Sequence, residues 1–477
     1  MIYKGLHIQQ GIKSTPLGEQ QMKKFDVIVV GAGTAGSMTA KTAAKAGLNV
    51  CLIDGKARGD IGEKVCGDAV GKHHFDRLGL PYPRGDELGT RIEGIRIFSP
   101  DVQTVFTVKS ETYGFILNRH RFGQRLLNDA VDAGATLLDS TIAVKPEVKD
   151  GFVTGLAAKD TRKSSTARLQ SKVVVDASGF TAILRKCLPP EMGIDLHVNN
   201  EDVEACYREI RQLKGSDFNQ KYCEIYLDQT QTPSGYQWIF PEGGNRVNVG
   251  LGVAMVEGFP NPKNQFYKQI LPNSMIKDST VVKGGSWYVP TRRPLDCMTG
   301  NGVVVVGDSA CQVNPIHGGG IGPSMMGGSL AGKTIVRAIE KDDVSRGRLW
   351  QYNVDYMKSY GAKQAGLDIF RLFLLKSIGN EEINYGMKYK LITEDDLLKV
   401  SEGQNLQLRI TDKTRRAFYG LGKLPMLRRL RDTANLLKKM KTHYTNYPSS
   451  PEGFEKWRKQ TQALMKKANA QLSRSKA

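Results

Sequence analysis

The sequence predicts a mixed α/β (α+β) fold, with a parallel-sheet domain, a second domain built on an antiparallel sheet and a helical C-terminal region. A strand, a glycine turn, a helix and a second strand follow one another between Asp26 and Asp54. Short runs of alternating apolar and polar residues then occupy 181–299, and the pattern becomes helical after about Asp342. We therefore expect a disordered leader at 1–21, a nucleotide-binding domain at 22–180 plus 300–340, an antiparallel-sheet domain at 181–299 and a helical domain at 341–477.

The composition is that of a globular protein with a large positive charge. Hydrophobic residues make up 40% of the 477 residues and charged residues 24%. No apolar run reaches the ~20 residues that span a bilayer. The formal net charge of +20 favours anionic partners, such as nucleic acid, anionic lipid headgroups or a phosphorylated substrate. The seven cysteines are dispersed, which indicates intracellular thiols rather than disulfides or a zinc site, and we expect no bound metal.

The first glycine motif, GAGTAG, directly follows an apolar strand. Gly31 permits a tight turn, Gly33 lets a pyrophosphate approach the backbone, and Gly36 lets the helix pack on the sheet. The helix N-terminus stabilises phosphate charge, and Asp54 at the tip of the next strand can accept hydrogen bonds from a ribose. The motif predicts a Rossmann-like dinucleotide site, with a glycine turn in an ordinary α/β unit as the alternative.

Two later segments extend this domain. Residues 172–179 (KVVVDASG) form another buried strand, and residues 301–328 (NGVVVVGDSACQVNPIHGGGIGPSMMGG) form a strand followed by a glycine-rich helix start. Asp308 at this strand end can hydrogen-bond a cofactor hydroxyl, and the N–H groups that open the helix can face phosphate or an electron-rich ring. A helix N-cap is the alternative role for Asp308.

Together these segments resemble the FAD-dependent flavoproteins that include para-hydroxybenzoate hydroxylase. Residues 63–72 (EKVCGDAVGK) and 236–241 (YQWIFP) are similar to a Cys-Gly loop and a YxWxFP substrate motif of the archaeal geranylgeranyl reductases. The resemblance covers Met22 to the mid-300s, and the remainder more loosely. It implies a Rossmann-like FAD-binding domain and an enzyme that saturates C=C bonds of geranylgeranyl chains in archaeal membrane-lipid biosynthesis. The implied substrates are digeranylgeranylglycerophospholipid and geranylgeranyl diphosphate.

The resemblance also implies a set of FAD contacts in the glycine turn, the Cys-Gly loop, the following helix and strand, and the last motif. These are Gly31, Gly33, Ala35, Gly36, Asp54, Cys66, Gly67, Ala69, Arg119, Ala143, Asp308, Gly320 and Ile321. The sequence departs from the family at Asn118, where the family often has Asp. A salt bridge at the helix start is therefore the alternative for Arg119.

Reduction of an isolated alkene needs a hydride from the flavin and a proton donor in a channel that excludes water. Cys66 is the predicted catalytic residue. Because an unperturbed thiol has a pKa of ~8.5, Cys66 is a poor sole acid, and it could instead tune the flavin or shape the pocket. A small residue in a tight loop is the alternative. Cys311 could lie near it, and His317 is a second candidate for the acid.

Four residues of the YxWxFP motif are the predicted substrate contacts: Tyr236, Trp238, Phe240 and Pro241. Their alternation suits a strand that presents flat apolar faces to a polyprenyl chain. From the pattern alone, a strand of the sheet core is the alternative.

The segment 421–441 combines an apolar helical face (Leu427, Leu430, Ala434 and Leu437) with many lysines and arginines. Such a helix either rests on an anionic membrane or packs on the main body with a solvated basic face. We expect a cytoplasmic, peripherally membrane-associated enzyme that takes a polyprenyl phospholipid or diphosphate and electrons from ferredoxin or NAD(P)H, without nucleic acid. The alternatives are an aromatic monooxygenase of the same FAD fold and, more distantly, a non-catalytic basic nucleic-acid-binding protein.

Overall fold

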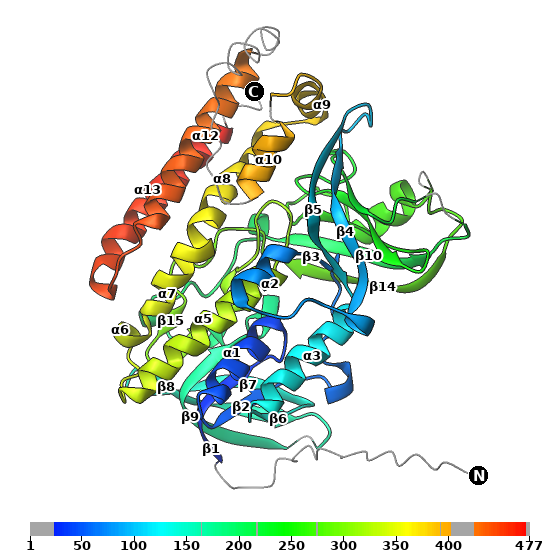
Figure 1. The fold of residues 1–477 in the computed structure, drawn as a ribbon. Coiled ribbons are helices and arrows are strands. Elements are labelled where there is room, and N and C mark those ends of the chain that lie inside the picture. The colour runs from blue at the N-terminus through cyan, green and yellow to red at the C-terminus, as the bar shows by residue number, and fades with distance from the viewer. Residues whose placement is uncertain are drawn as a thin grey trace, which may run out of the picture.

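The computed structural model describes residues 23–163, 165–215, 218–272, 275–391, 393–401 and 424–473 (Figure 1). The predicted leader at 1–21 lies outside these residues. The helices are α1 (Thr34–Lys45), α2 (Lys72–Leu78), α3 (Arg119–Asp132), α4 (Pro262–Gln265), α5 (Ile321–Glu340), α6 (Arg346–Leu349), α7 (Gln351–Tyr356), α8 (Ala362–Ser377), α9 (Asn380–Lys388), α10 (Glu394–Ser401), α12 (Leu424–Thr445) and α13 (Phe454–Ser473). None of these helices is long and apolar enough to cross a membrane.

The first sheet is parallel at its centre and contains the predicted nucleotide-binding strands. Its main path runs β15-β16-β9-β1-β2-β6, and β7 and β8 extend it from β9 as antiparallel strands. Its strands are β1 (Lys23–Val30), β2 (Val50–Ile53), β6 (Thr136–Leu138), β7 (Thr141–Lys149), β8 (Phe152–Asp160), β9 (Thr166–Asp176), β15 (Thr299–Gly300) and β16 (Val303–Val305). The three segments that the sequence joined into one domain thus lie side by side as β1, β9 and β16.

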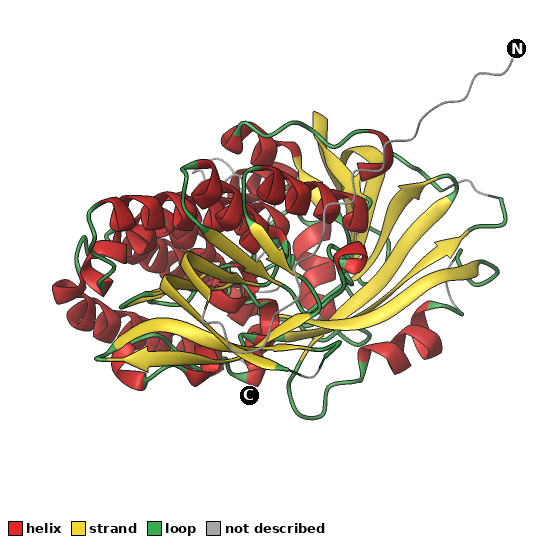
Figure 2. Cartoon of the chain, turned by 90° about the horizontal axis from the view of Figure 1, so that it is seen from below, coloured by secondary structure: helices red, strands yellow, loops and turns green. Residues whose placement is uncertain are grey.

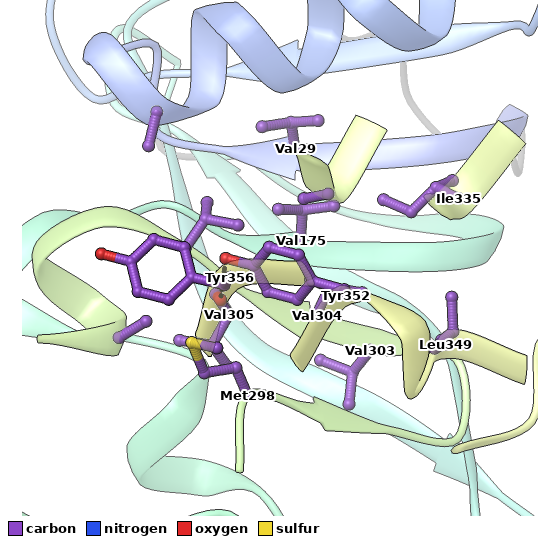
Figure 3. Close-up of a cluster of buried hydrophobic side chains, with 14 of the residues drawn as sticks. Val29, Val175, Met298, Val303, Val304, Val305, Ile335, Leu349, Tyr352 and Tyr356 are labelled. Atoms are coloured by element: carbon purple, nitrogen blue, oxygen red, sulfur yellow. Dashed lines mark hydrogen bonds between the residues drawn. The ribbon is translucent and has the colours of Figure 1, made fainter. Parts of the chain in front are cut away.

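The core of this domain forms where the central strands meet the helices. Val29, Val175 and Val304 come from neighbouring strands and are fully buried (Figure 3). Ile335 of α5 and Tyr352 of α7 pack in the same cluster. Parallel strands are covered on both faces, which is why they read as continuous apolar runs in the sequence. Each fully buried side chain of this kind contributes about 1.5–3 kcal/mol to folding.

The second sheet is largely antiparallel, with strand order β14-β10-β13-β12-β11-β4-β5-β3. Figure 2 shows its long strands side by side. The strands are β3 (Ala69–Gly71), β4 (Leu88–Phe98), β5 (Val105–Leu117), β10 (Glu204–Gln212), β11 (Tyr222–Tyr226), β12 (Gln237–Gly243), β13 (Arg246–Ala254) and β14 (Thr280–Val289). The mixed α/β fold with an antiparallel second sheet and a helical C-terminal region is confirmed.

The two sheets do not divide the chain at the predicted boundaries. Residues 69–117 fall within the segment predicted to bind the nucleotide, yet they supply β3, β4 and β5 to the second sheet. β4 pairs in parallel with β11, which lies far along the chain, and this pairing joins residues 69–117 to the second sheet. An alternating pattern shows that a segment is a strand but not which sheet it joins, so the domain boundaries stay a prediction.

The basic C-terminal helix α12 packs its apolar face on the protein itself. Leu430 and Leu437 are buried, whereas Lys438 and Lys439 are exposed. Gly366 of α8 allows the close approach, because a Cβ at Gly366 would lie 3.4 Å from the Leu437 side chain. Of the two alternatives for this helix, the structure shows the apolar face packed on the main body and the basic face outward.

Candidate cofactor and substrate site

A continuous cavity of about 1310 Å³ connects the glycine turn after β1 to the apolar side of the C-terminal helices. Typical small-molecule pockets have about 300–1,000 Å³, so this volume suits a large ligand or two ligands. Its polar part is lined by the glycine turn, the Cys66 loop and the start of α5. Its apolar part is lined by side chains such as Phe106, Ile225, Phe373, Met387, Met426 and Leu430.

The glycine turn has the stereochemistry that the motif predicts. Gly31 has φ +102°, and a Cβ there would lie 2.3 Å from the carbonyl oxygen of Ala177. A Cβ at Gly36 would lie 1.8 Å from the Gly31 oxygen, which shows how closely α1 approaches the turn. At Gly33, by contrast, no described atom beyond the adjoining backbone lies within 4 Å of the Cβ position. Gly33 and Ala35 line the cavity, so the backbone is open there to a ligand.

Two charged side chains flank this turn. The Asp54 carboxylate, at the end of β2, accepts hydrogen bonds from the backbone N–H of Ala32 at 2.8 Å and of Lys56 at 2.9 Å. The Arg119 guanidinium lines the cavity and donates from Nη2 to Thr34 Oγ1 at 2.5 Å. Its Nε is buried without a hydrogen-bond partner in the described chain, and no ion pair of Arg119 is found among the described residues. Buried donors are rarely left unpaired, and this one suits an anionic ligand.

The Cys66 loop lies over the second sheet and is held by its side chains. The Cys66 carbonyl accepts hydrogen bonds from Arg208 Nε at 3.2 Å and from Asn248 Nδ2 at 2.8 Å. A Cβ at Gly67 would lie 3.1 Å from the Phe240 ring, so the loop touches the YxWxFP strand. Burial raises the pKa of the Cys66 thiol, and the Asp68 carboxylate raises it further. The thiol is therefore a weaker acid than a free cysteine.

The aromatic residues of the YxWxFP motif form one wall of the cavity. Tyr236, Trp238 and Phe240 all line it, with successive ring centroids 6.0 Å and 6.2 Å apart. The Trp238 Nε1–H donates to Asn248 Oδ1 at 3.0 Å. Pro241, one residue further, is buried but is not among the residues that line the cavity. Alternation along the strand turns it to the opposite face.

The last glycine-rich motif closes the polar part of the cavity. Asp308 lies in a 3₁₀ turn after β16 and pairs with Lys64 Nζ at 2.7 Å. Gly320 is the N-cap of α5, and both Gly320 and Ile321 line the cavity. A Cβ at Gly320 would lie 3.2 Å from Asp308 Oδ1, which places this carboxylate at the helix start.

Some of the other predicted residues line the cavity and others do not. Ala69, in β3, lines it. Ala143 is buried in β7 and does not line it; its strand begins beside Asp54, where the Thr141 N–H donates to the Asp54 carbonyl at 2.8 Å. Cys311 does not line it either, whereas Cys206 does. The described cysteines are all free thiols.

Several residues that shape the site were not found from the sequence. The face of β10 that lines the cavity carries Glu204, Cys206 and Arg208 at every second position. On neighbouring β13, a Cβ at Gly250 would lie 2.3 Å from the Trp238 indole, so this glycine makes room for the ring. The signal was present as alternation in EACYR and NVGLG, but alternation alone does not say which face meets a ligand.

His317 lines the cavity and receives the Tyr236 hydroxyl on its carbonyl oxygen at 2.7 Å. Its side chain is exposed on the cavity side, yet desolvation by the surrounding chain lowers the pKa of the imidazole to about 4, with the Lys363 charge as a second cause. A neutral imidazole at neutral pH is a poor proton donor, so this candidate acid is weakened.

The sequence is 44% identical over 453 residues to the digeranylgeranylglycerophospholipid reductase of Sulfolobus acidocaldarius, which covers 94% of this chain and 99% of that protein. The chain belongs to the digeranylgeranylglycerophospholipid reductase family. The resemblance inferred from the two glycine motifs, the Cys66 loop and the YxWxFP motif is thereby confirmed.

Domain models match parts of the chain, and solved structures share its fold. A model of the geranylgeranyl reductase catalytic domain matches residues 202–286, and a lycopene cyclase protein model matches residues 26–206. The crystal structure of a geranylgeranyl bacteriochlorophyll reductase-like protein from Thermoplasma acidophilum has a TM-score of 0.72 at 23% identity, covering 87% of this chain and all of that one. A flavin-dependent brominase has a TM-score of 0.57 at 19% identity, covering 83% and 99%. These two structures share the fold.

Proposed function

We propose that this member of the reductase family is an FAD-dependent oxidoreductase that saturates C=C bonds in the geranylgeranyl chains of digeranylgeranylglycerophospholipids. The observation that carries the proposal is the continuity of the cavity. It joins an open glycine turn, which suits a dinucleotide, to an apolar part lined by aromatic and aliphatic side chains. A polyprenyl chain can lie in the apolar part while one of its double bonds faces the polar part.

The residues at the polar end fit FAD. Gly33 leaves the backbone open at the N-terminus of α1. The Arg119 Nε, which has no partner among the described residues, suits a phosphate or ring oxygen. The Asp54 carboxylate keeps free lone pairs for a ribose diol beside its two backbone hydrogen bonds. The proposed cofactor contacts remain Gly31, Gly33, Ala35, Gly36, Asp54, Cys66, Gly67, Ala69, Arg119, Ala143, Asp308, Gly320 and Ile321.

Bound FAD, once reduced, supplies a hydride to one carbon of the alkene. The protein's own contribution is to orient the chain and to exclude water. We propose that Tyr236, Trp238 and Phe240 hold the branched chain against their ring faces, with Pro241 shaping the strand behind them. Cys66 lies in the loop over the second sheet, where it would shape the pocket beside the cofactor; its raised pKa argues against a role as the sole acid.

We further propose that the enzyme takes electrons from a reduced ferredoxin or from NAD(P)H and works at an anionic membrane surface. The net charge of +20 supports both an acidic ferredoxin and anionic headgroups. Since Leu430 and Leu437 of α12 are buried, contact would be made by exposed basic side chains such as Lys438 and Lys439 rather than by the apolar face of this helix. Each basic residue near such a surface adds about 1 kcal/mol.

The test is an anaerobic half-reaction. The purified flavoprotein is reduced with dithionite, mixed with digeranylgeranylglyceryl phosphate, and the lipid is followed by mass spectrometry. Stepwise gain of hydrogen pairs, lost when the flavin is removed and regained when FAD is added, supports the proposal. An unchanged lipid beside a fully reducible flavin overturns it. NADPH-dependent oxygen uptake with phenols would then favour the monooxygenase of the same fold.

A further inference from the structure

An isolated alkene needs an acid as well as a hydride. The trisubstituted double bonds of a geranylgeranyl chain have no adjacent carbonyl, so no enolate can hold charge after hydride addition. One carbon must receive a proton from a group that lies in the cavity and is protonated near neutral pH. The titratable side chains that line the cavity can therefore be compared for this role.

Most of these side chains are unsuitable because of their contacts or their pKa. The Tyr236 hydroxyl already donates to the His317 carbonyl at 2.7 Å, and burial keeps its pKa well above that of a free tyrosine. His317 is exposed on the cavity side, and desolvation by the surrounding chain lowers its pKa to about 4. Burial likewise makes the Cys66 thiol a weaker acid. Asp308 is occupied by an ion pair with Lys64 at 2.7 Å. Asp68 also lines the cavity, but its carboxyl group accepts a hydrogen bond from Asn248 Nδ2 at 3.0 Å and pairs with Arg208 at 4.0 Å.

Glu204 differs from these groups in its position and its lack of partners. It is the first residue of β10, is 6% exposed and lines the cavity. Within the part of the chain that the structure describes, no hydrogen bond or ion pair of its carboxyl group is found. A charged carboxylate buried in this way would be costly, so the neutral acid is the favoured form.

The neighbours of Glu204 direct its carboxyl group toward the site. On β13, a Cβ at Gly252 would lie 2.9 Å from Glu204 Oε2, so this carboxyl oxygen lies over a position without a side chain. The Gly252 N–H bonds the Tyr236 carbonyl at 3.1 Å, which links the same place to the aromatic wall. Glu204 also shares its face of β10 with Arg208, which bonds the Cys66 carbonyl. The carboxyl group thus faces the cavity between the wall and the Cys66 loop.

The electrostatic surroundings support an acid that is active near neutral pH. Burial raises the pKa of Glu204 from 4.5 to about 7, and the Arg371 charge on α8 opposes the shift. Arg371 is itself held by Asp202 at 2.6 Å and Asp368 at 2.9 Å, so its charge is largely neutralised. Cys206 and Tyr236 also face this group, and both are neutral because burial raises each pKa well above its usual value. An acid with a pKa near the working pH is the most effective proton donor.

We propose that the carboxyl group of Glu204 donates the proton that completes saturation of the double bond. The inference rests on the proposed reductase function and adds a catalytic residue to it. One alkene carbon receives a hydride from the reduced cofactor, and the other forms a C–H bond with the proton as the O–H bond of Glu204 breaks. The alkene is reduced, the cofactor is oxidised, and Glu204 is left as a carboxylate. It regains a proton from water between turnovers.

The test compares Glu204→Gln, which keeps the shape but cannot act as an acid, with Glu204→Asp, which retains an acid on a shorter side chain. The matched control is Glu224→Gln, since Glu224 is buried in the same sheet without lining the cavity. In E204Q, dithionite should reduce the flavin as in the wild type, but reoxidation by the lipid should slow by about 100-fold or more. E204D should keep part of the rate, and E224Q all of it.

A readout independent of turnover is the infrared band of the protonated carboxyl group. The difference between wild-type and E204Q spectra should show a carboxylic acid band that disappears as the pH rises through about 7. Wild-type reoxidation rates in a folded, flavin-loaded E204Q, or the absence of this band from the difference spectrum, would overturn the inference. Failure of the wild-type protein itself to reduce the lipid would instead overturn the proposed function.

Discussion

The side-chain amide of Asn248 donates a hydrogen bond of 2.8 Å to the main-chain carbonyl oxygen of Cys66. The same amide accepts the Trp238 Nε1–H on its Oδ1 at 3.0 Å. One fully buried side chain on β13 therefore sets both the loop beside the proposed flavin site and the aromatic wall proposed for the lipid. Asn248 thus links the two proposed halves of the site directly.

Replacement of Asn248 by alanine should disturb both halves together. The Asn248→Ala change leaves the Trp238 N–H without its buried acceptor and removes one of the two donors to the Cys66 carbonyl, at a cost of about 2 kcal/mol in the free energy of unfolding. Urea unfolding measures this loss, and lipid-dependent reoxidation should slow as well. Asn49→Ala, at an exposed side-chain hydrogen bond to the Lys24 carbonyl, is the control and should change stability by less than about 0.5 kcal/mol. Equal stabilities for the two variants would contradict the prediction.

Arg119 should strengthen cofactor binding more than it stabilises the fold. Its Nε has no protein partner in the described chain, so Arg119→Ala removes a charged donor available to FAD. We expect a loss of about 2 kcal/mol, or roughly 30-fold in the Kd for FAD, from fluorescence titration of the apoprotein. Arg121→Ala, at an exposed position of the same helix α3, should leave the Kd unchanged. An unaltered FAD affinity in R119A would rule out this role for Arg119.

The carboxyl groups of Asp68 and Glu242 should make the protein less stable as the pH rises. Burial raises the pKa of Glu242 from 4.5 to about 8, and the Arg208 and Arg246 charges oppose this shift. Burial also raises the pKa of Asp68 from 3.8 to about 6, and the Arg208 and Arg119 charges oppose that shift. When the pKa of a group is raised by folding, the folded state binds more protons than the unfolded state at every pH between the unfolded-state pKa and the folded-state pKa. Stability should therefore be highest at the acid end of this window and fall as the pH rises from about 4.5 to about 8.

Glu242→Gln removes one of these titrations while keeping an oxygen that can accept from Asn248 Nδ2, now at 3.3 Å. Melting temperatures measured across the window should fall less steeply with pH in E242Q than in the wild type. Glu340→Gln, at an exposed site on α5, should follow the wild type. Identical slopes for E242Q and the wild type would show that Glu242 is not responsible.

The C-terminal helices should set the length of chain that the cavity accepts. Leu374 of α8 is half-buried and lines the cavity, so Leu374→Trp fills part of it. Reduction of a full-length geranylgeranyl lipid should slow by roughly tenfold or more, because each methylene group that no longer fits an apolar pocket costs about 1–3 kcal/mol of binding free energy. A lipid with shorter geranyl chains, assayed on the same variant, should be reduced at close to the wild-type rate. Equal slowing of both substrates would indicate general damage instead.

Local features of the fold were predictable because they depend on neighbouring residues. The turn at Gly31 requires a positive φ, and this requirement is visible in the order of the glycines. The position of the Asp54 carboxylate was predictable as well, because this residue directly follows an apolar run. Trp238 and Phe240 were placed on one face by simple alternation.

The residues missed were those whose role depends on distant contacts. Asn248 and Cys66 are 182 positions apart, and nothing near Asn248 in the chain marks it as the partner of a loop carbonyl. Glu204 reads as an ordinary strand residue until the fold places it at the cavity. The C-terminal segment was predicted to be helical, but its part in lining the apolar end of the cavity was not foreseen.

By itself, the sequence determined the nature of this protein: a Rossmann-like glycine turn with its acid, a Cys-Gly loop, an aromatic strand and the reductase family to which they belong. Only the tertiary structure decided which strands form each sheet, which carboxyl groups face the cavity, and which helices enclose its apolar part. The physical reason is that backbone stereochemistry and side-chain alternation act over a few residues. Burial, pKa and the pairing of polar groups depend instead on atoms that only folding brings together.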